Sequence, residues 1–166
     1  MPQVVNRIFA SYLYPTTPEP SPVRSIAHGL KHGDAEAINS AARCMATRVH
    51  QDAVLVPIPG SEGHADNMLL LAKAIQRHSH YRVVIADILH SAQRLSHYES
   101  KKRGKALTVS DLAMATKAHS YSLSRLILID NVADTGKTIR SARNALGVEA
   151  PAIVYAMSAD LLVTTI

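Results

Sequence analysis

Short apolar runs recur along this chain, and each is bounded by polar or turn-forming residues. Runs of this length, rich in β-branched and aliphatic side chains, are typical of strands that are buried on both faces. Strict alternation of apolar and polar residues, the mark of a half-exposed strand, is missing from them. The pattern predicts strands at residues 53–57, 81–89, 125–130 and 152–159.

Amphipathic stretches separate these runs. In residues 34–50, Asp34 is a good N-cap, and apolar side chains follow it at helical spacing. These apolar positions are Ala37, Ile38, Ala41, Ala42, Met45 and Val49. The same criteria predict helices at residues 23–33, 34–50, 66–78, 109–118 and 136–147.

Strands that alternate with helices indicate an α/β fold, in which a mostly parallel twisted sheet is flanked by helices. Residues 14–22 contain four prolines, which excludes a helix interior or a central strand there. We therefore expect residues 1–22 to form an N-terminal extended arm and residues 23–166 to form a single domain. Ligands of such sheets bind beyond the carboxyl ends of the strands, so the loops after Pro57, Leu89 and Asp130 are the candidate functional loops.

Composition narrows the class of protein. A chain of 166 residues suits one domain with its own core, and the single cysteine, Cys44, excludes a disulfide framework and a cysteine-based zinc site. The start of the chain is unlike a signal peptide, and no run is long enough to span a bilayer. We expect a cytoplasmic protein with no membrane contact.

The formal charge of +5 fits a nucleic-acid binder or an enzyme with a polyanionic small substrate. The densest basic run, residues 101–105, has few aromatic neighbours on which bases could stack. Direct nucleic-acid binding therefore ranks last among the functions considered.

The stretch LILIDNVADTGKTI, residues 126–139, carries the clearest chemical signal. A triphosphate loop would need glycine at position 131, where Asn131 stands, and the two nearby aspartates would repel several phosphates. One phosphate fits better, because a helix that begins at residues 135–138 offers free amides and two hydroxyls. Acids at the strand end suit vicinal hydroxyls or a magnesium ion, so the pattern favours a ribose 5-phosphate.

This stretch resembles the phosphoribosyl pyrophosphate (PRPP) signature of type I phosphoribosyltransferases. Its Asp-Thr-Gly-Lys-Thr is similar to the sequence of the hypoxanthine-guanine members. A looser resemblance links SIAHGLKHGDAEAINSAARCMATRV, DAVLVPIP and GHADNMLLLAKAI to the ComF competence-protein branch. The resemblance covers residues 23–147 and implies the type I phosphoribosyltransferase fold.

The resemblance implies roles for the residues of the motif. Asp130 and Asn131 would bind the ribose hydroxyls, and Asp130 would hold Mg²⁺, through water. Asn131 stands where the family usually has a second acid, which removes one charge from this site. The 5-phosphate would be bound by Asp134, Thr135, Gly136, Lys137 and Thr138.

Asp130 and Asp134 are the expected catalytic residues. In purine enzymes of the family, the aspartate that matches Asp134 lies near the incoming base and accepts a proton from it. General-base assistance of this kind is worth roughly 10²–10⁴ in rate. An equally good reading is that Asp134 only closes the turn by accepting backbone amides.

Two other segments are expected to contact the pyrophosphate. The loop after residue 57 would bind it through Gly60, Ser61, Glu62 and Gly63, because glycine permits the strained backbone that the family uses there. Glu62 is unfavourable beside phosphates unless it faces magnesium or solvent. Residues 90–107 occupy the place of a mobile lid, whose cations would stabilise the departing pyrophosphate. These cations are Arg94, Lys101, Lys102, Arg103 and Lys105.

The expected function is transfer of ribose 5-phosphate from PRPP to a nitrogen base, with Mg²⁺ as cofactor and release of pyrophosphate. The alternative is a non-catalytic PRPP-binding regulator or a ComF-like accessory protein of DNA uptake. We also expect a homo-oligomer. The sequence leaves the acceptor base open.

Overall fold

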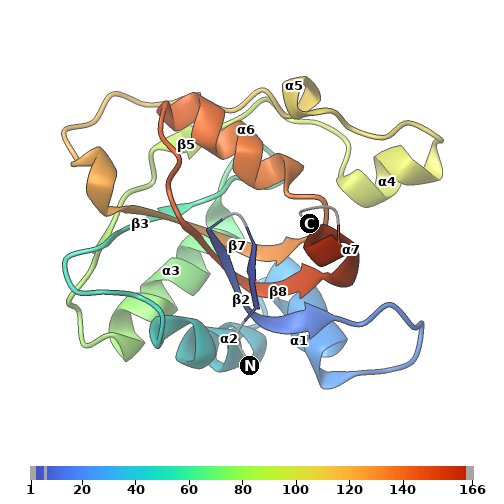
Figure 1. Cartoon of the computed structure of the whole chain (residues 1–166), viewed down its shortest axis with the longest axis horizontal. Coiled ribbons are helices and arrows are strands. Elements are labelled where there is room, and N and C mark those ends of the chain that lie inside the picture. Colours follow the sequence, from blue (N-terminus) through green and yellow to red (C-terminus); the bar gives the residue numbers. More distant parts are fainter. Residues whose placement is uncertain (1–2, 6, 164–166) are drawn as a thin grey trace.

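The computed structural model describes residues 3–5 and 7–163, and it shows one six-stranded sheet between layers of helices (Figure 1). The strands lie in the order β1-β2-β8-β7-β3-β4. All neighbouring strands are parallel except β1 and β2. The mostly parallel α/β architecture expected from the sequence is confirmed. The strands are β1 (Gln3–Val5), β2 (Ile8–Tyr14), β3 (Val54–Pro57), β4 (Val84–Ile85), β7 (Leu126–Ala133) and β8 (Ala152–Ser158).

Helices cover both faces of the sheet (Figure 1). Side chains of β7 point alternately to the two layers, because successive residues of a strand face opposite sides. Leu126 and Leu128 are buried with residues of α6, whereas Ile127 and Ile129 are buried with residues of α1, α2 and α3. Each such burial contributes about 1.5–3 kcal/mol to folding. The helices are α1 (Pro22–Lys31), α2 (Ala35–Ala46), α3 (Asp66–His78) and α6 (Lys137–Leu146).

The strand order reverses between β3 and β7. The chain leaves β3 through α3 toward β4 on one side, and it leaves β7 through α6 toward β8 on the other. β3 and β7 are paired up to Pro57 and Ile129, and the amide of Ile58 donates to the carbonyl of Ile129 at 3.0 Å. The loops that follow these strands therefore open side by side at the switch point, where α/β sheets bind ligands.

The N-terminal segment differs from the expected arm. Residues 8–14 form β2, which pairs with β8 in the main sheet, and Ile8 and Ala10 are buried in the core. The expectation of an arm over residues 1–22 is thus wrong for β2, whose apolar run lies just before Pro15. Residues 15–21 have no regular secondary structure, in agreement with their proline content.

Residues 81–118 also differ in detail from the prediction. The single strand expected at residues 81–89 is split into β4 and β5, and β5 belongs to a separate two-stranded sheet with β6. The helix expected at residues 109–118 ends after four residues, where Ala113 adopts φ 38°. The remaining elements are β5 (Leu89–His90), α4 (His97–Lys102), α5 (Val109–Leu112), β6 (Ala115–Thr116), a 3₁₀ turn at Leu123–Arg125 and α7 (Ala159–Val163).

None of the helices in the described ranges has the length and apolar character needed to cross a membrane.

Candidate functional site

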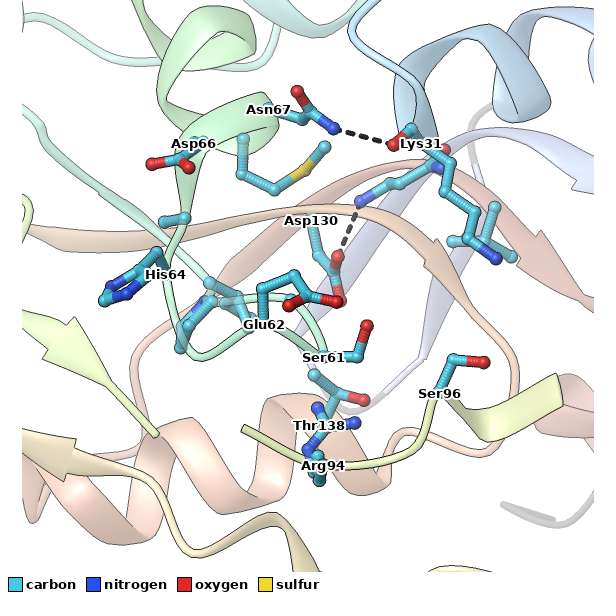
Figure 2. A pocket seen from close by; sticks show the side chains of 17 residues that line it. Lys31, Ser61, Glu62, His64, Asp66, Asn67, Arg94, Ser96, Asp130 and Thr138 are labelled. Atoms are coloured by element: carbon cyan, nitrogen blue, oxygen red, sulfur yellow. Dashed lines mark hydrogen bonds between the residues drawn. The ribbon is translucent and has the colours of Figure 1, made fainter. Parts of the chain in front are cut away.

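A pocket of about 530 Å³ opens at the switch point of the sheet. Its walls are the loop after β3, the end of β7, the first turns of α3 and α6, the end of α1, and the segment before α4 (Figure 2). Segments far apart in sequence thus supply one cavity. Of the residues proposed from the sequence, those that line it are Gly60, Ser61, Glu62, Arg94, Asp130, Asn131 and Thr138.

Asp130 is the partly buried acid at the centre of this pocket (Figure 2). Removal from water raises the pKa of its carboxyl group to about 6. The amide of Asn131, which donates to Oδ1 at 2.8 Å, and the positive charge of Arg94 oppose this shift. The charged form is therefore costly in the free protein, and a cation or a hydroxyl donor in the pocket would stabilise it.

Arg94 supplies a fixed positive charge to the same pocket. Its backbone amide donates to the carbonyl of Ser61 at 2.9 Å, which ties it to the loop after β3. Burial lowers the pKa of its guanidinium, and the charge of Asp130 opposes that change. The Nε atom is buried and has no hydrogen-bond partner within the described ranges. Arg94 thus brings a positive charge to the pocket lining, where it could meet an anion, and keeps one buried donor without a partner among the described residues.

The loop after β3 has one position that requires glycine. Gly63 has φ 87°, and a Cβ atom built on it would lie 2.4 Å from the carbonyl oxygen of Ser91. The amide of Ser91 in turn donates to the carbonyl of Gly63 at 3.2 Å. Gly60 has no positive φ, and the nearest atom to its Cβ position would be 3.8 Å away. The special backbone expected at both glycines is therefore found at Gly63 alone.

Glu62 is held at the mouth of the pocket by Gln93, whose Nε2 donates to Oε2 at 2.8 Å. Its carboxylate and that of Asp130 point into the same cavity (Figure 2). Two carboxylates suit Mg²⁺, which is commonly bound by one or two protein carboxylates together with substrate phosphates and water. Within the described part of the chain, no group of three or more metal-ligating side chains is found. The residues present fit a metal that arrives with its substrate.

The turn between β7 and α6, where the sequence predicts the 5-phosphate site, leads into a helix start without a side-chain cap. Gly136 has φ 71° and precedes the first residue of α6, and no side chain caps this helix start. Thr138 lines the pocket, whereas Asp134 and Thr135 are exposed. The start of α6 therefore borders the pocket at Thr138, and no side chain caps its first amides, which are free to bind an anion.

Two side chains of the motif donate hydrogen bonds to partners outside the pocket. Lys137 donates from Nζ to the carbonyl of Leu107 at 3.0 Å, and so it binds the segment before α5. Asn131 donates from Nδ2 to the carbonyl of Ala27 in α1 at 2.7 Å. Its Oδ1 is buried without a hydrogen-bond partner among the described residues. The ammonium group of Lys137 is therefore engaged outside the pocket, and the Asn131 amide is partly used to hold α1.

The basic residues expected in a lid are not gathered at the pocket. Lys102, Arg103 and Lys105 are exposed and do not line this pocket. They are also absent from the lining of a neighbouring cavity between residues 14–21 and α1. Lys101, in α4, lines that neighbouring cavity. Arg94 alone of the five lies in the pocket, because its segment pairs with the loop after β3.

Lys31 is a pocket residue that the sequence analysis missed. It is the last residue of α1, its side chain is exposed, and its carbonyl accepts from Nδ2 of Asn67 at 2.7 Å (Figure 2). Asn67 belongs to the first turn of α3, so this bond joins the end of α1 to the pocket rim. Basic residues are common in the last turn of a helix, so the sequence gives no signal for this position.

Comparison with known proteins gives structural neighbours at low identity. No protein-family model matches the chain, and no curated protein matches it. Among solved structures, it is similar to a hypoxanthine-guanine phosphoribosyltransferase from Bacillus anthracis, with 13% identity, a TM-score of 0.40, and coverage of 79% of this chain and 68% of the other. It is also similar to a glutamine mutant from an analysis of an invariant aspartic acid in HPRTs, with 17% identity, a TM-score of 0.39, and coverage of 74% and 66%. At identities and TM-scores this low, neither neighbour assigns an activity to this chain.

Proposed function

We propose that this protein is a phosphoribosyltransferase, which transfers ribose 5-phosphate from PRPP to a nitrogen base and releases pyrophosphate. The observation that carries the proposal is the position of Asp130. It lies between the uncapped start of α6 and the loop after β3, at the point where the strand order reverses. PRPP has three parts that match this arrangement: its 5-phosphate would bind the start of α6, its ribose would bind Asp130, and its pyrophosphate would bind the loop after β3.

In this proposal the 5-phosphate binds the first amides of α6 and the hydroxyls of Thr135 and Thr138. Asp130 accepts hydrogen bonds from the ribose hydroxyls. The pyrophosphate lies on the loop after β3, where Arg94 and the backbone around Ser61 meet it. Such contacts position the sugar, and correct positioning can supply a large part of a rate enhancement.

The reaction breaks the bond between C1 of the ribose and the pyrophosphate oxygen, and it forms a bond between C1 and a ring nitrogen. The bonding electrons leave with the pyrophosphate, whose growing negative charge is stabilised by the guanidinium of Arg94. The proton of the ring nitrogen passes to a base such as the Asp134 carboxylate. Mg²⁺, bound with the substrate near Asp130 and Glu62, would neutralise phosphate charge.

Calorimetric titration with PRPP and Mg²⁺ tests the binding step. We expect saturable binding to the wild-type protein and a loss of at least about tenfold in affinity for Asp130→Ala, because a buried charge-assisted hydrogen bond is worth about 1.5–3 kcal/mol. Asp87→Ala is a matched control, since Asp87 lies outside this pocket and its carboxylate forms an exposed ion pair with Lys117. No binding by the wild-type protein would reject the proposal.

Pyrophosphate release with a panel of purines and pyrimidines tests turnover. Pyrophosphate release that occurs only when one class of base is present would support the transferase proposal. Tight PRPP binding without release for every acceptor would instead favour the non-catalytic regulator.

A further inference from the structure

A second cavity, of about 1090 Å³, adjoins the candidate pocket. It lies between residues 14–21, the exposed face of α1, and the carboxyl ends of β7 and β8. Lys31, Asn131 and Val132 line both cavities. A molecule in the second cavity would therefore lie next to a ribose held at Asp130.

The proline-rich segment borders this cavity and is held in place by Arg24. Arg24 of α1 donates from Nη2 to the carbonyl of Pro15 at 3.0 Å and to the carbonyl of Thr17. Its guanidinium also lies over the ring of Tyr14, 5.7 Å from the ring centroid. Because prolines lose little backbone freedom on ordering, this segment costs little to hold in place when a ligand binds.

Side chains of both charges line the cavity. Asp134 follows β7 and Asp160 lies in α7, the helix after β8, whereas Lys31 and Lys101 come from α1 and α4. No ion pair involves either lysine in the described part of the chain. His28 of α1 also lines the cavity, one helical turn before Lys31. A ligand that carries both a hydrogen-bond donor and a negative charge would find an acceptor and a cation in this cavity.

We propose that this cavity binds the nitrogen acceptor of the reaction, and that the acceptor is a carboxylated nitrogen heterocycle. The inference rests on the proposed transferase function. Its ring N–H faces Asp134, and its carboxylate faces Lys31 and Lys101. When the ring nitrogen attacks C1, its proton passes to the Asp134 carboxylate and the C1–O electron pair leaves with pyrophosphate, so atoms and charge balance.

The test compares acceptors that differ only in an acidic group. Uracil and its 6-carboxylate, orotate, form one such pair, and pyrazole and pyrazole-4-carboxylate, which also carry a ring N–H, form another. Each is titrated calorimetrically into protein saturated with ribose 5-phosphate, which lacks the leaving group and cannot react. We expect at least one carboxylated member to bind about tenfold or more tightly than its neutral partner.

Variants connect this preference to the cavity. Lys101→Ala should remove most of the preference, because Lys101 lines the second cavity and not the first. Ribose 5-phosphate affinity should stay within about threefold of wild type. Lys73→Ala, a change of an exposed lysine of α3 outside both cavities, should leave both affinities unchanged.

Two failures are distinguishable. Absence of binding of both ribose 5-phosphate and PRPP would reject the transferase proposal itself. If the sugar phosphate binds but neutral bases bind as well as carboxylated ones, if no acceptor binds, or if Lys101→Ala keeps the full preference, the acceptor inference is overturned.

Discussion

Two loops border the candidate pocket, and the structure holds them in different ways. The loop after β3 is bonded to residues 91–94, which are distant in sequence, through Ser91, Gln93 and Arg94. The turn after β7 depends on local backbone geometry, with Gly136 at positive φ directly before an uncapped helix. The first loop is thus built by tertiary contacts, and the second by three or four consecutive residues.

Because of this difference, we expect substitutions in the two loops to have different effects. A change in the first loop should disturb every segment bonded to it, including the one that carries Arg94. A change in the second should act locally, on the helix start and on the phosphate. Substitutions in each loop, and at Asp130 between them, test this difference between tertiary and local control.

Gly63→Ala should have the largest effect. The new Cβ would meet the carbonyl oxygen of Ser91 at 2.4 Å, and the φ of 87° is unfavourable for alanine. Strain and clash together should lower the free energy of unfolding by about 3 kcal/mol. Binding of inorganic pyrophosphate, measured by calorimetry, should be lost with it.

Gly60→Ala is the control for this change. Its backbone is ordinary, and the nearest atom would be 3.8 Å from the new Cβ. The free energy of unfolding, measured by thermal melts, should change by less than about 1 kcal/mol. Equal damage by the two substitutions would contradict the view that residues 91–94 define this loop.

Asp130→Asn should stabilise the free protein in a pH-dependent way. The carboxyl pKa is about 6 in the folded state and 3.8 ordinarily, so ionisation of Asp130 opposes folding. The resulting cost is absent below pH 4, grows between pH 4 and 6, and is complete above pH 6. With partial solvent access, it should amount to about 2 kcal/mol, since one pKa unit corresponds to 1.36 kcal/mol.

Thermal melts of both proteins between pH 4 and 8 measure this effect. For a chain of this size, the variant should melt about 4–8 °C higher above pH 7 and near the wild-type temperature at pH 4. A difference that does not vary with pH would show that Asp130 is not strained by burial. PRPP affinity of the same variant should fall, so stability and binding would change in opposite directions.

The contrast between the loops also explains which features the sequence could predict. The apolar run of β7, the start of α6 and the buried positions Ala41 and Met45 follow from local periodicity and turn chemistry, and the structure confirms them. By contrast, Asn131 bonds to Ala27, which is 104 positions away, and no local pattern records such a partner.

Other differences have the same origin. Lys137 was expected at the phosphate, but it bonds to a carbonyl 30 positions away. The strand β2 was included in an arm because the prolines that follow it dominate the local pattern, whereas its pairing with β8 is a long-range contact. The three-dimensional partners of a side chain, and therefore its exact role, lie beyond local sequence signals.

Gly136→Ala should have a moderate and local effect. Alanine at φ 71° costs about 1–2 kcal/mol, and its Cβ would touch Leu161 at 3.4 Å. The altered turn should weaken ribose 5-phosphate binding about tenfold while pyrophosphate binding is kept. Gly147→Ala, at the other end of α6 with φ 66° and no atom within 4 Å of its Cβ, should cost about 1 kcal/mol and leave both ligands unaffected.

Lys137→Met should have the smallest effect. Because the ammonium group bonds to the carbonyl of Leu107 and not to the pocket, its loss removes one partly buried hydrogen bond, worth about 1 kcal/mol. Ribose 5-phosphate affinity, measured by calorimetry, should stay within about threefold of wild type, since the backbone amide at position 137 remains. A loss of tenfold or more would mean that the lysine leaves its long-range partner Leu107 and binds the phosphate directly.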